Sequence, residues 1–396
     1  MLVSPSQIKT LLDQKRAAFS SFNRAKFELL QGYHQAWVEF AALPLAQQIN
    51  QLAIHPSPTG AQPLEELAEA KKGIIPFFCA ESAPATAPWS NREASKQWVQ
   101  DILTDITTFA VDGSQISPGK DLSIPIALIQ IGWFENPHSP DQPYDKDVRV
   151  DLMTPKDLGP NPAQPVERRV NIRRFQMEVA RLVEFMDTCP QPERTLVFFD
   201  GALVVTFAEA FDQDSQTAYV QAMLDLLAAS ERRRVPLVGY VDTSYARDLT
   251  TLLHHGYGLE ATEGIHDAQL LSQLMEWGDR TAVFQCDRGG ILDDYSTHQD
   301  QITFTYLKTT RDGHPARLEM PRWMWDSGQM PQYLNWVRGE VIVGGGYPYA
   351  IETADQTAVL QGQDKHIFFR VLQDWAERES INLRLSRKMV SKQRRR

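Results

Sequence analysis

Several common sequence signatures are missing from this chain of 396 residues. It has no uninterrupted apolar run of about 18 residues, so we expect no membrane-spanning helix. Its N-terminus lacks the charged-then-apolar pattern of a secretion signal. The three cysteines, Cys79, Cys189 and Cys286, are far apart and have no CxxC spacing. We therefore expect reduced thiols and a cytoplasmic protein.

Motifs of several catalytic classes are missing as well. The sequence has no GxSxG, no GxxxxGK[ST] and no HExxH pattern, so serine hydrolases, P-loop hydrolases and zinc proteases lack support. His254, His255 and His266 lack the spacing of metal ligands and are interpreted as surface or loop histidines. The net charge of −10 argues against nucleic acid as a ligand. Arginines nevertheless gather locally, as at 168–174 and in the C-terminal tail, so net charge does not decide the ligand.

Two apolar segments end in the dipeptide Asp-Gly. Segment 106–112 ends at Asp112, before Gly113, and segment 195–200 ends at Asp200. Strand interiors avoid aspartate, so a carboxylate at a strand end lies where side chains can converge above a sheet. The glycine allows a sharp turn and close approach of a ligand. Because Asp-Gly is also a common turn dipeptide, a plain turn is the alternative for either segment taken alone.

Apolar patterns between residues 106 and 242 predict the order β-β-β-α-β-α-β. The predicted elements are strands at 106–112, 124–134 and 148–152, a helix at 166–186, a strand at 196–200, a helix at 215–232 and a strand at 237–242. The first two strands are continuously apolar, which indicates burial on both faces, whereas the third alternates as an edge strand does. Short turns followed by two right-handed helical crossovers predict a mixed five-stranded sheet flanked by helices.

The flanking regions are predicted from composition and helical periodicity. Residues 1–55 form an N-terminal helical arm that begins at Ser4-Pro5. Its apolar stripe suits another helix of this chain or of a second copy, and consists of Leu30, Tyr33, Trp37 and Phe40. Residues 56–100, rich in proline and alanine, are predicted to be a mostly irregular linker. Residues 363–396 are predicted to be a C-terminal helix with a basic tail, which is usually a solvated end.

One acidic residue shares the apolar face of the helix at 166–186. Glu178 follows Phe175 by three residues, which predicts that its side chain points toward the sheet. A carboxylate is costly to bury unless it is paired or bound to a metal. Glu178 therefore either pairs with an arginine of its own helix or meets Asp112 and Asp200.

A convergent set of carboxylates has a definite chemistry. Oxygen-only ligands suit Mg²⁺ or Mn²⁺, and such ions act on phosphates. Two ions of this kind can activate water and stabilise the leaving oxygen of a phosphodiester. A metal-dependent hydrolase of small phosphorylated substrates is an alternative, because fold alone does not set the substrate.

These motifs together resemble the NurA nuclease family, over about residues 100–362. The resemblance is carried by Asp112-Gly113-Ser114, Glu178, Phe199-Asp200-Gly201 and Gly346-Tyr347-Pro348-Tyr349 with Ala354-Asp355. It implies an RNase H-like core, dependence on Mn²⁺ or Mg²⁺, and degradation of DNA ends in double-strand-break repair. It also implies a homodimer that docks on a hexameric HerA-type translocase. Residues 101–362 would then be the nuclease domain.

The resemblance also assigns roles by position. Asp112, Glu178 and Asp200 match the metal-binding carboxylates, and Tyr347 matches a late active-site tyrosine. Asp355 stands where many relatives carry histidine, and we predict it as a fourth metal ligand on an inward helix face. The alternative is that Asp355 is an acid at the edge of the helix, paired with a nearby basic group. A second departure is Asp242, where a lysine is expected, so a non-catalytic DNA-end or translocase-docking subunit is the rival function.

Overall fold

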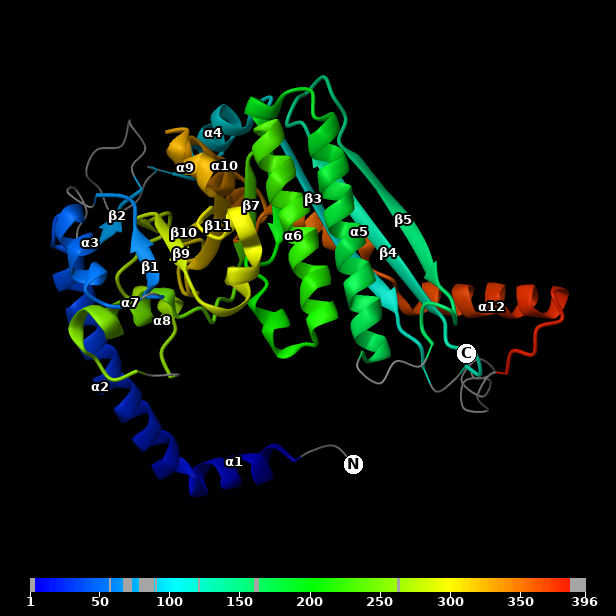
Figure 1. Cartoon of the computed structure of the whole chain (residues 1–396), viewed down its shortest axis with the longest axis horizontal. Coiled ribbons are helices and arrows are strands. Elements are labelled where there is room, and N and C mark those ends of the chain that lie inside the picture. The colour runs from blue at the N-terminus through cyan, green and yellow to red at the C-terminus, as the bar shows by residue number, and fades with distance from the viewer. Residues whose placement is uncertain are drawn as a thin grey trace. The chain divides into compact units, whose positions relative to one another are not determined.

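The computed structural model describes residues 4–56, 58–66, 73–77, 89, 91–119, 122–159, 164–261 and 264–384. Figure 1 shows the helices and strands of the chain. The chain divides into two compact units. Unit 1 comprises Met1–Phe78, Asp242–Gly289 and Phe304–Arg317, and unit 2 comprises Cys79–Val241, Gly290–Thr303 and Leu318–Arg396. None of the described helices is both long and apolar enough to cross a bilayer. The predicted basic tail beyond residue 384 lies outside the described residues.

Unit 2 is built on a mixed sheet. Its strands are β3 (Thr107–Ile116), β4 (Ala127–Asn136), β5 (Asp145–Met153), β6 (Thr195–Asp200) and β7 (Leu237–Val241). They lie in the order β7-β6-β3-β4-β5, and the end of β11 (Ala316–Pro321) follows next to β7. β6 is parallel to β3 and β7, whereas β4 is antiparallel to β3 and β5. The predicted order of strands and helices is confirmed, and so is the mixed α/β fold.

Helices cover both faces of this sheet. α5 (Val166–Thr188) and α6 (Gln213–Arg233) pack on one face, and α11 (Tyr349–Ala358) lies across the other. The alternation of side chains along β3 separates them. Phe109 stacks on Phe185 of α5 with ring centroids 3.8 Å apart, whereas Ser114 Oγ donates to Ala358 O of α11 at 2.5 Å. Residues 109, 111 and 113 therefore face α5, and residues 112 and 114 face α11.

The remaining elements of unit 2 surround this core. They are α4 (Arg92–Leu103), the 3₁₀ segments η1 (Pro192–Arg194), η2 (Thr206–Ala210) and η3 (Gly290–His298), α9 (Arg322–Asp326), α10 (Met330–Val343) and α12 (Gly362–Arg378). β11 was not predicted, because its sequence alternates arginine and glutamate with apolar residues although every one of its residues is buried. The helix predicted within residues 363–396 is α12, which begins one residue earlier, at Gly362.

Unit 1 contains the N-terminal helices and several short strands. Its elements are α1 (Pro5–Gln14), α2 (Arg16–Ala41), α3 (Leu45–Ala53), β1 (Gly60–Pro63), β2 (Ile74–Ile75), α7 (Asp248–Tyr257), α8 (Asp267–Leu271), β8 (Arg280–Thr281), β9 (Phe284–Asp287) and part of β10 (Ile302–Leu307). β1 pairs with β9, and β2 pairs with β8. The predicted linker thus contributes two short strands, so it is not simply irregular.

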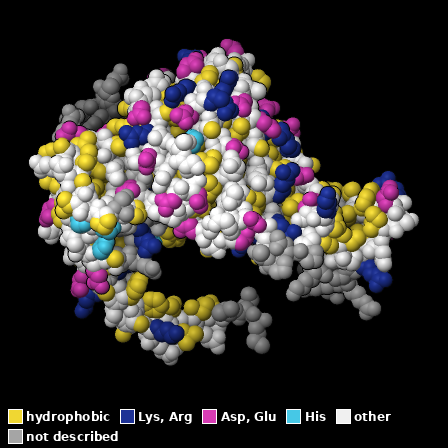
Figure 2. Space-filling view, viewed as in Figure 1, with side chains coloured by type: hydrophobic (Ala, Val, Ile, Leu, Met, Phe, Trp, Pro, Cys, Tyr) yellow, Lys and Arg dark blue, Asp and Glu magenta, His cyan; other side chains and the backbone are white. Residues whose placement is uncertain are grey.

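The predicted apolar stripe of α2 packs inside unit 1. Tyr33, Trp37 and Phe40 are buried; the Tyr33 hydroxyl donates to Glu260 O at 2.9 Å, and the Trp37 ring lies 6.3 Å from that of Phe284. The hypothesis that this stripe forms a dimer contact was therefore wrong, because its rings already have partners in their own chain. Other apolar side chains of α1 and early α2 are exposed instead (Figure 2), and include Ile8, Leu11, Leu12, Phe19, Phe22 and Phe27.

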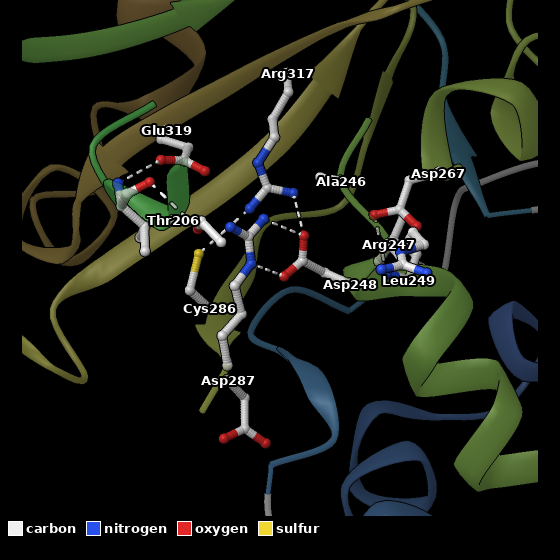
Figure 3. A network of polar contacts seen from close by, with 12 residues as sticks. Thr206, Ala246, Arg247, Asp248, Leu249, Asp267, Cys286, Asp287, Arg317 and Glu319 are labelled. Atoms are coloured by element: carbon white, nitrogen blue, oxygen red, sulfur yellow. Dashed lines mark hydrogen bonds and ion pairs between the residues drawn. The ribbon is translucent and has the colours of Figure 1, made fainter. Parts of the chain in front are cut away.

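A buried ion-pair network lies inside unit 1 (Figure 3). The Asp248 carboxylate, 2% exposed, accepts hydrogen bonds from the guanidinium groups of Arg288 and Arg317. Asp267, fully buried, accepts from the backbone N–H groups at the start of α7 and from the Tyr306 hydroxyl at 3.0 Å. Each buried acid of this network therefore has several donors, as buried charges require.

Candidate active site

Asp112 lies inside β3. The expectation that the strand ends there was wrong, because β3 continues to Ile116 and the residues after Asp112 stay paired with β4. The ladder hydrogen bonds outweigh the weak strand preference of Gly113. The plain turn is excluded for the same reason. Strand alternation directs the Asp112 side chain to the face covered by α11.

Gly113 makes room for Glu178 on the opposite face. A Cβ atom at Gly113 would lie 2.3 Å from Glu178 Oε1 and 2.8 Å from Cγ of Arg174. Arg174 also donates to Gly113 O at 2.7 Å. Two side chains of α5, and not the predicted ligand, approach Gly113 on this face, and any larger residue would collide with them.

The structure places Glu178 beside Arg174 of its own helix, and its role as a metal ligand stays a prediction. Glu178 is 9% exposed, and its Oε1 lies 3.5 Å from Arg174 Nε. That oxygen is buried and accepts no hydrogen bond from any described residue. The Glu178 carboxylate also senses the charges of Asp112 and Asp200, so the carboxylates of β3, α5 and β6 lie near one another.

Asp200 ends β6 as predicted. Gly201 follows it with φ of 143°, a conformation that favours glycine and turns the chain away from the sheet. The Tyr347 hydroxyl donates to Asp200 Oδ1 at 2.9 Å. The Tyr347 ring also packs edge-on against Tyr240 of β7, with centroids 5.2 Å apart. Tyr347 therefore holds the Asp200 carboxylate in place.

Asp355 reaches the site from α11. The glycines before this helix allow a tight bend, since a Cβ atom at Gly344 would lie 2.0 Å from Tyr347 O. The Asp355 carboxylate lies close enough to Asp112 to raise the pKa of Asp112. The predicted inward face was wrong, because Asp355 is exposed, as is Val359 one turn later. Asp355 thus lies at the rim of the acidic group, where water still reaches it.

Asp112, Glu178, Asp200 and Asp355 form an acidic group. Burial and mutual repulsion raise the pKa values of two of its members. Burial raises the pKa of Glu178 to about 8; Arg174 opposes this rise, and the charges of Asp112 and Asp200 add to it. Burial likewise raises the pKa of Asp112 to about 6; the next backbone N–H opposes the rise, and Asp355 and Asp200 add to it. Like charges held together resist ionisation, so this group favours a bound cation.

The donor set suits a hard divalent cation, because all of its donors are carboxylate oxygens. The oxygen of Glu178 without a hydrogen bond and the mutual repulsion of the acids are what a bound cation would relieve. Among the described residues, however, no three His, Cys, Asp or Glu side chains are already arranged to hold a metal ion. The residues therefore fit a metal by their chemistry, and ligand geometry would require small side-chain movements.

Two residues that support the site were not predicted. Glu340 of α10 is fully buried and accepts from Thr108 Oγ1 and Ala350 N, each at 2.8 Å. It thereby joins β3 to the start of α11. Ser114 donates to Ala358 O, and its Oγ accepts from Leu360 N at 3.1 Å, which fixes the end of α11. The motif in which Ser114 follows Asp-Gly was a usable signal, whereas Glu340 had none in the sequence.

The local arginine cluster on α5 is structural. Arg168 pairs with Asp212, Arg173 pairs with Asp151, and Arg169 donates to three backbone carbonyl groups of the loop at 157–159. These contacts neutralise or occupy the guanidinium groups, so the cluster does not by itself form a basic binding surface.

Asp242 follows the end of β7. β7 ends at Val241, and Asp242 is exposed, with a local hydrogen bond from Thr243 Oγ1. His254 and His255 lie on α7, where their rings are 5.0 Å apart. Both are half-buried, and His254 Nδ1 forms a hydrogen bond with Leu259 O, so these two histidines are helical residues and not loop residues.

The fold and the acidic group define an α/β protein with a mixed sheet and carboxylates gathered at the β3, β6, α5 and α11 junction. A family model, described as the NurA domain, matches residues 106–360 and so spans the whole of this site. The chain belongs to the NurA family. This membership makes it a nuclease, as the resemblance of its motifs implied.

Solved structures give weaker likenesses. A crystal structure of NurA with manganese is 8% identical over 72% of this chain and 94% of that one, with a TM-score of 0.41. The catalytic domain of human Endonuclease V is 11% identical, and the match covers 77% of this chain and 94% of that one, with a TM-score of 0.35. Endonuclease V from Bacillus subtilis is 11% identical, and the match covers 72% of this chain and 95% of that one, with a TM-score of 0.32. No curated protein matches the sequence. The family assignment rests on the domain match.

Proposed function

We propose that this chain is a deoxyribonuclease that hydrolyses phosphodiester bonds at DNA ends and depends on Mn²⁺ or Mg²⁺. The observation that carries the proposal is the buried Glu178 oxygen, which accepts no hydrogen bond from a described residue and faces the charges of two further acids. A purely structural acid would be satisfied by donors, as Asp248 is in unit 1.

The metal would be held by Asp112, Glu178, Asp200 and Asp355. When bound, it supplies a Lewis acid for the phosphodiester and for water. Tyr347 orients the Asp200 carboxylate through its hydroxyl. Arg174 is fixed between Gly113 O and Glu178, where its guanidinium lowers the pKa of Glu178 against the effect of burial. These groups set the charge and orientation of the acids.

The biological setting belongs to the same proposal. End resection in double-strand-break repair, a homodimer and a hexameric HerA-type translocase are supported by the family. The exposed apolar residues of α1 and early α2, such as Leu11 and Phe22, offer a surface for a second copy. A cytoplasmic location is supported by the free cysteines Cys189 and Cys286.

The decisive experiment incubates the full chain with end-labelled linear DNA, with and without Mn²⁺. We expect cleavage with the metal, none in chelator, and a loss of about 100-fold or more in Asp112→Asn, because a charged ligand is removed with little change in volume. Glu352→Gln is the matched control, since Glu352 is an exposed acid on α11. Near-normal cleavage by Asp112→Asn at saturating Mn²⁺ would remove Asp112 from the site.

A non-catalytic subunit that binds DNA ends or docks on a translocase is the second candidate. It is favoured by the lack of a ready three-ligand group among the described residues and by the two family departures, Asp242 and Asp355. DNA binding without cleavage in either Mn²⁺ or Mg²⁺, by a folded wild-type protein, would decide for this candidate.

A further inference from the structure

An exposed aromatic ring lies in the segment that leaves the candidate active site. Phe207 belongs to η2, between Asp200 and α6, and 54% of its surface is exposed. Burying a phenylalanine side chain stabilises a folded protein, so the exposure of Phe207 gives up part of that stabilisation. Single exposed apolar residues are common, and the importance of Phe207 therefore depends on its surroundings.

Three further rings fix the orientation of Phe207. Its centroid lies 5.0 Å from Tyr219, 6.2 Å from Phe211 and 6.5 Å from Phe175, all in edge-to-face geometry. Each such contact stabilises the ring beyond the burial of its surface area. The Arg168 guanidinium lies 4.1 Å from the Phe211 centroid and holds the far side of this cluster. Phe207 is thus exposed and yet held on one side.

The aromatic cluster borders the acidic group. Phe175 precedes Glu178 by one helical turn on the same face of α5. Its ring also contacts Phe199, the residue before Asp200, with centroids 5.8 Å apart. The support of the exposed ring is therefore shared with two of the acids.

We propose that Phe207 stacks on a base of single-stranded DNA beside the cleaved phosphodiester. This inference rests on the proposed nuclease function and adds how the substrate strand is held. Every base has a π-face, so stacking tolerates any sequence, as a nuclease that degrades DNA ends requires. The acids repel phosphates, and the stacked base provides binding energy that does not depend on charge.

The expected contribution follows from base stacking. One base on an aromatic side chain is worth about 1–3 kcal/mol, which corresponds to about 5-fold to 150-fold in affinity. Phe207→Ala and Phe207→Leu should therefore weaken binding of single-stranded DNA by that factor. Phe207→Trp should restore it, because only the aromatic face is required.

The test measures the affinity of the full chain for a fluorescent single-stranded oligonucleotide by anisotropy, in chelator so that nothing is cleaved. A second oligonucleotide carries a run of abasic sites with the same phosphates. We expect the wild type to prefer the strand with bases, and Phe207→Ala to bind both strands alike. Trp375→Ala is the control, since Trp375 is a 45% exposed aromatic residue of α12 outside the cluster. Thermal melting checks that each variant folds.

The outcomes separate this inference from the proposed function. If Phe207→Ala keeps the wild-type preference for bases, stacking by Phe207 is overturned, even when the wild type cleaves DNA with Mn²⁺. If the preference depends on an aromatic residue at 207 but the wild type cleaves nothing with either metal, stacking is supported and the nuclease proposal fails. Restored binding in Phe207→Leu would also overturn stacking, because it would reveal simple apolar packing.

Discussion

Both units of this chain contain buried acids, and Asp248 of unit 1 and Glu178 of unit 2 have different surroundings. In unit 1, Asp248 receives two guanidinium groups, and its pKa is lowered because they outweigh the cost of burial. In unit 2, burial raises the pKa of Glu178 to about 8; Arg174 opposes this rise, and the charges of Asp112 and Asp200 add to it. Acids with sufficient donors hold a fold together, whereas acids that lack donors are available for a ligand.

The largest effect on stability is expected from breaking the buried ion-pair network of Asp248, Arg288 and Arg317 in unit 1. Asp248→Asn leaves the guanidinium groups of Arg288 and Arg317 without their counter-charge, and removing one partner of a buried ion pair costs about 3–5 kcal/mol. Urea denaturation should show this loss. Asp242→Asn, an exposed acid in the same unit, should stay within about 0.5 kcal/mol. A loss below about 1 kcal/mol for Asp248→Asn would show that the network is not what stabilises unit 1.

Replacing the buried acid of unit 2 by its amide, in Glu178→Gln, should raise the stability of the protein where Asp248→Asn lowers it. The folded pKa of Glu178, about 8, lies above its ordinary value of 4.5, so the folded chain keeps a proton that the unfolded chain releases. Stability from this group is full below pH 4.5 and is lost as pH rises toward 8. Glu178→Gln removes this loss and should stabilise the metal-free protein by ~2–4 kcal/mol above that range.

Thermal melting in chelator at several pH values measures this effect. The advantage of Glu178→Gln over the wild type should vanish near pH 4.5 and grow through the range up to 8. Cleavage should be lost at the same time. If Glu178→Gln were destabilised at high pH, Glu178 would be a satisfied structural acid, and the contrast between the two regions would disappear.

Gly113 tests how closely Glu178 must approach the strand. In Gly113→Ala the new methyl group would displace Glu178 Oε1 and Arg174, at an overpacking cost of about 1–3 kcal/mol. Cleavage should fall about 10-fold to 100-fold, because the ligand is shifted. Gly362→Ala is the control, since nothing lies within 4 Å of its added Cβ atom. Equal kcat/KM in Gly113→Ala and Gly362→Ala would show that the site tolerates the shift.

The smallest effect concerns the exposed rim of the acidic group. Asp355→Ala should raise the Mn²⁺ concentration required for half-maximal cleavage about tenfold, and Asp355→His should restore the wild-type requirement. Glu352→Ala, an exposed acid one turn earlier on α11, should leave it unchanged. An unchanged metal requirement in Asp355→Ala would make Asp355 structural and leave three carboxylates as ligands.

The sequence predicted the elements that form continuous apolar runs or repeat apolar residues with a helical period. β3, β4 and β6 appear as apolar runs, and Glu178 was found because it interrupts an apolar helix face. The sequence could not show features that depend on residues far away in the chain. The Asp-Gly pair at 112–113 indicates a turn unless β4 is known to pair with it, and Glu340 gains its role only from Thr108 and α11.

The position of α11 in the chain has a consequence for the growing polypeptide. β3, α5 and β6 are complete once β7 has been made at Val241, whereas Tyr347 and Asp355 follow more than 100 residues later (347 − 241 = 106). At about 5–20 residues per second, a ribosome needs about 5–20 s for that interval. During synthesis the acids of the sheet are therefore present before Tyr347 and Asp355, and the proposed nuclease centre is completed only after α11 has been made.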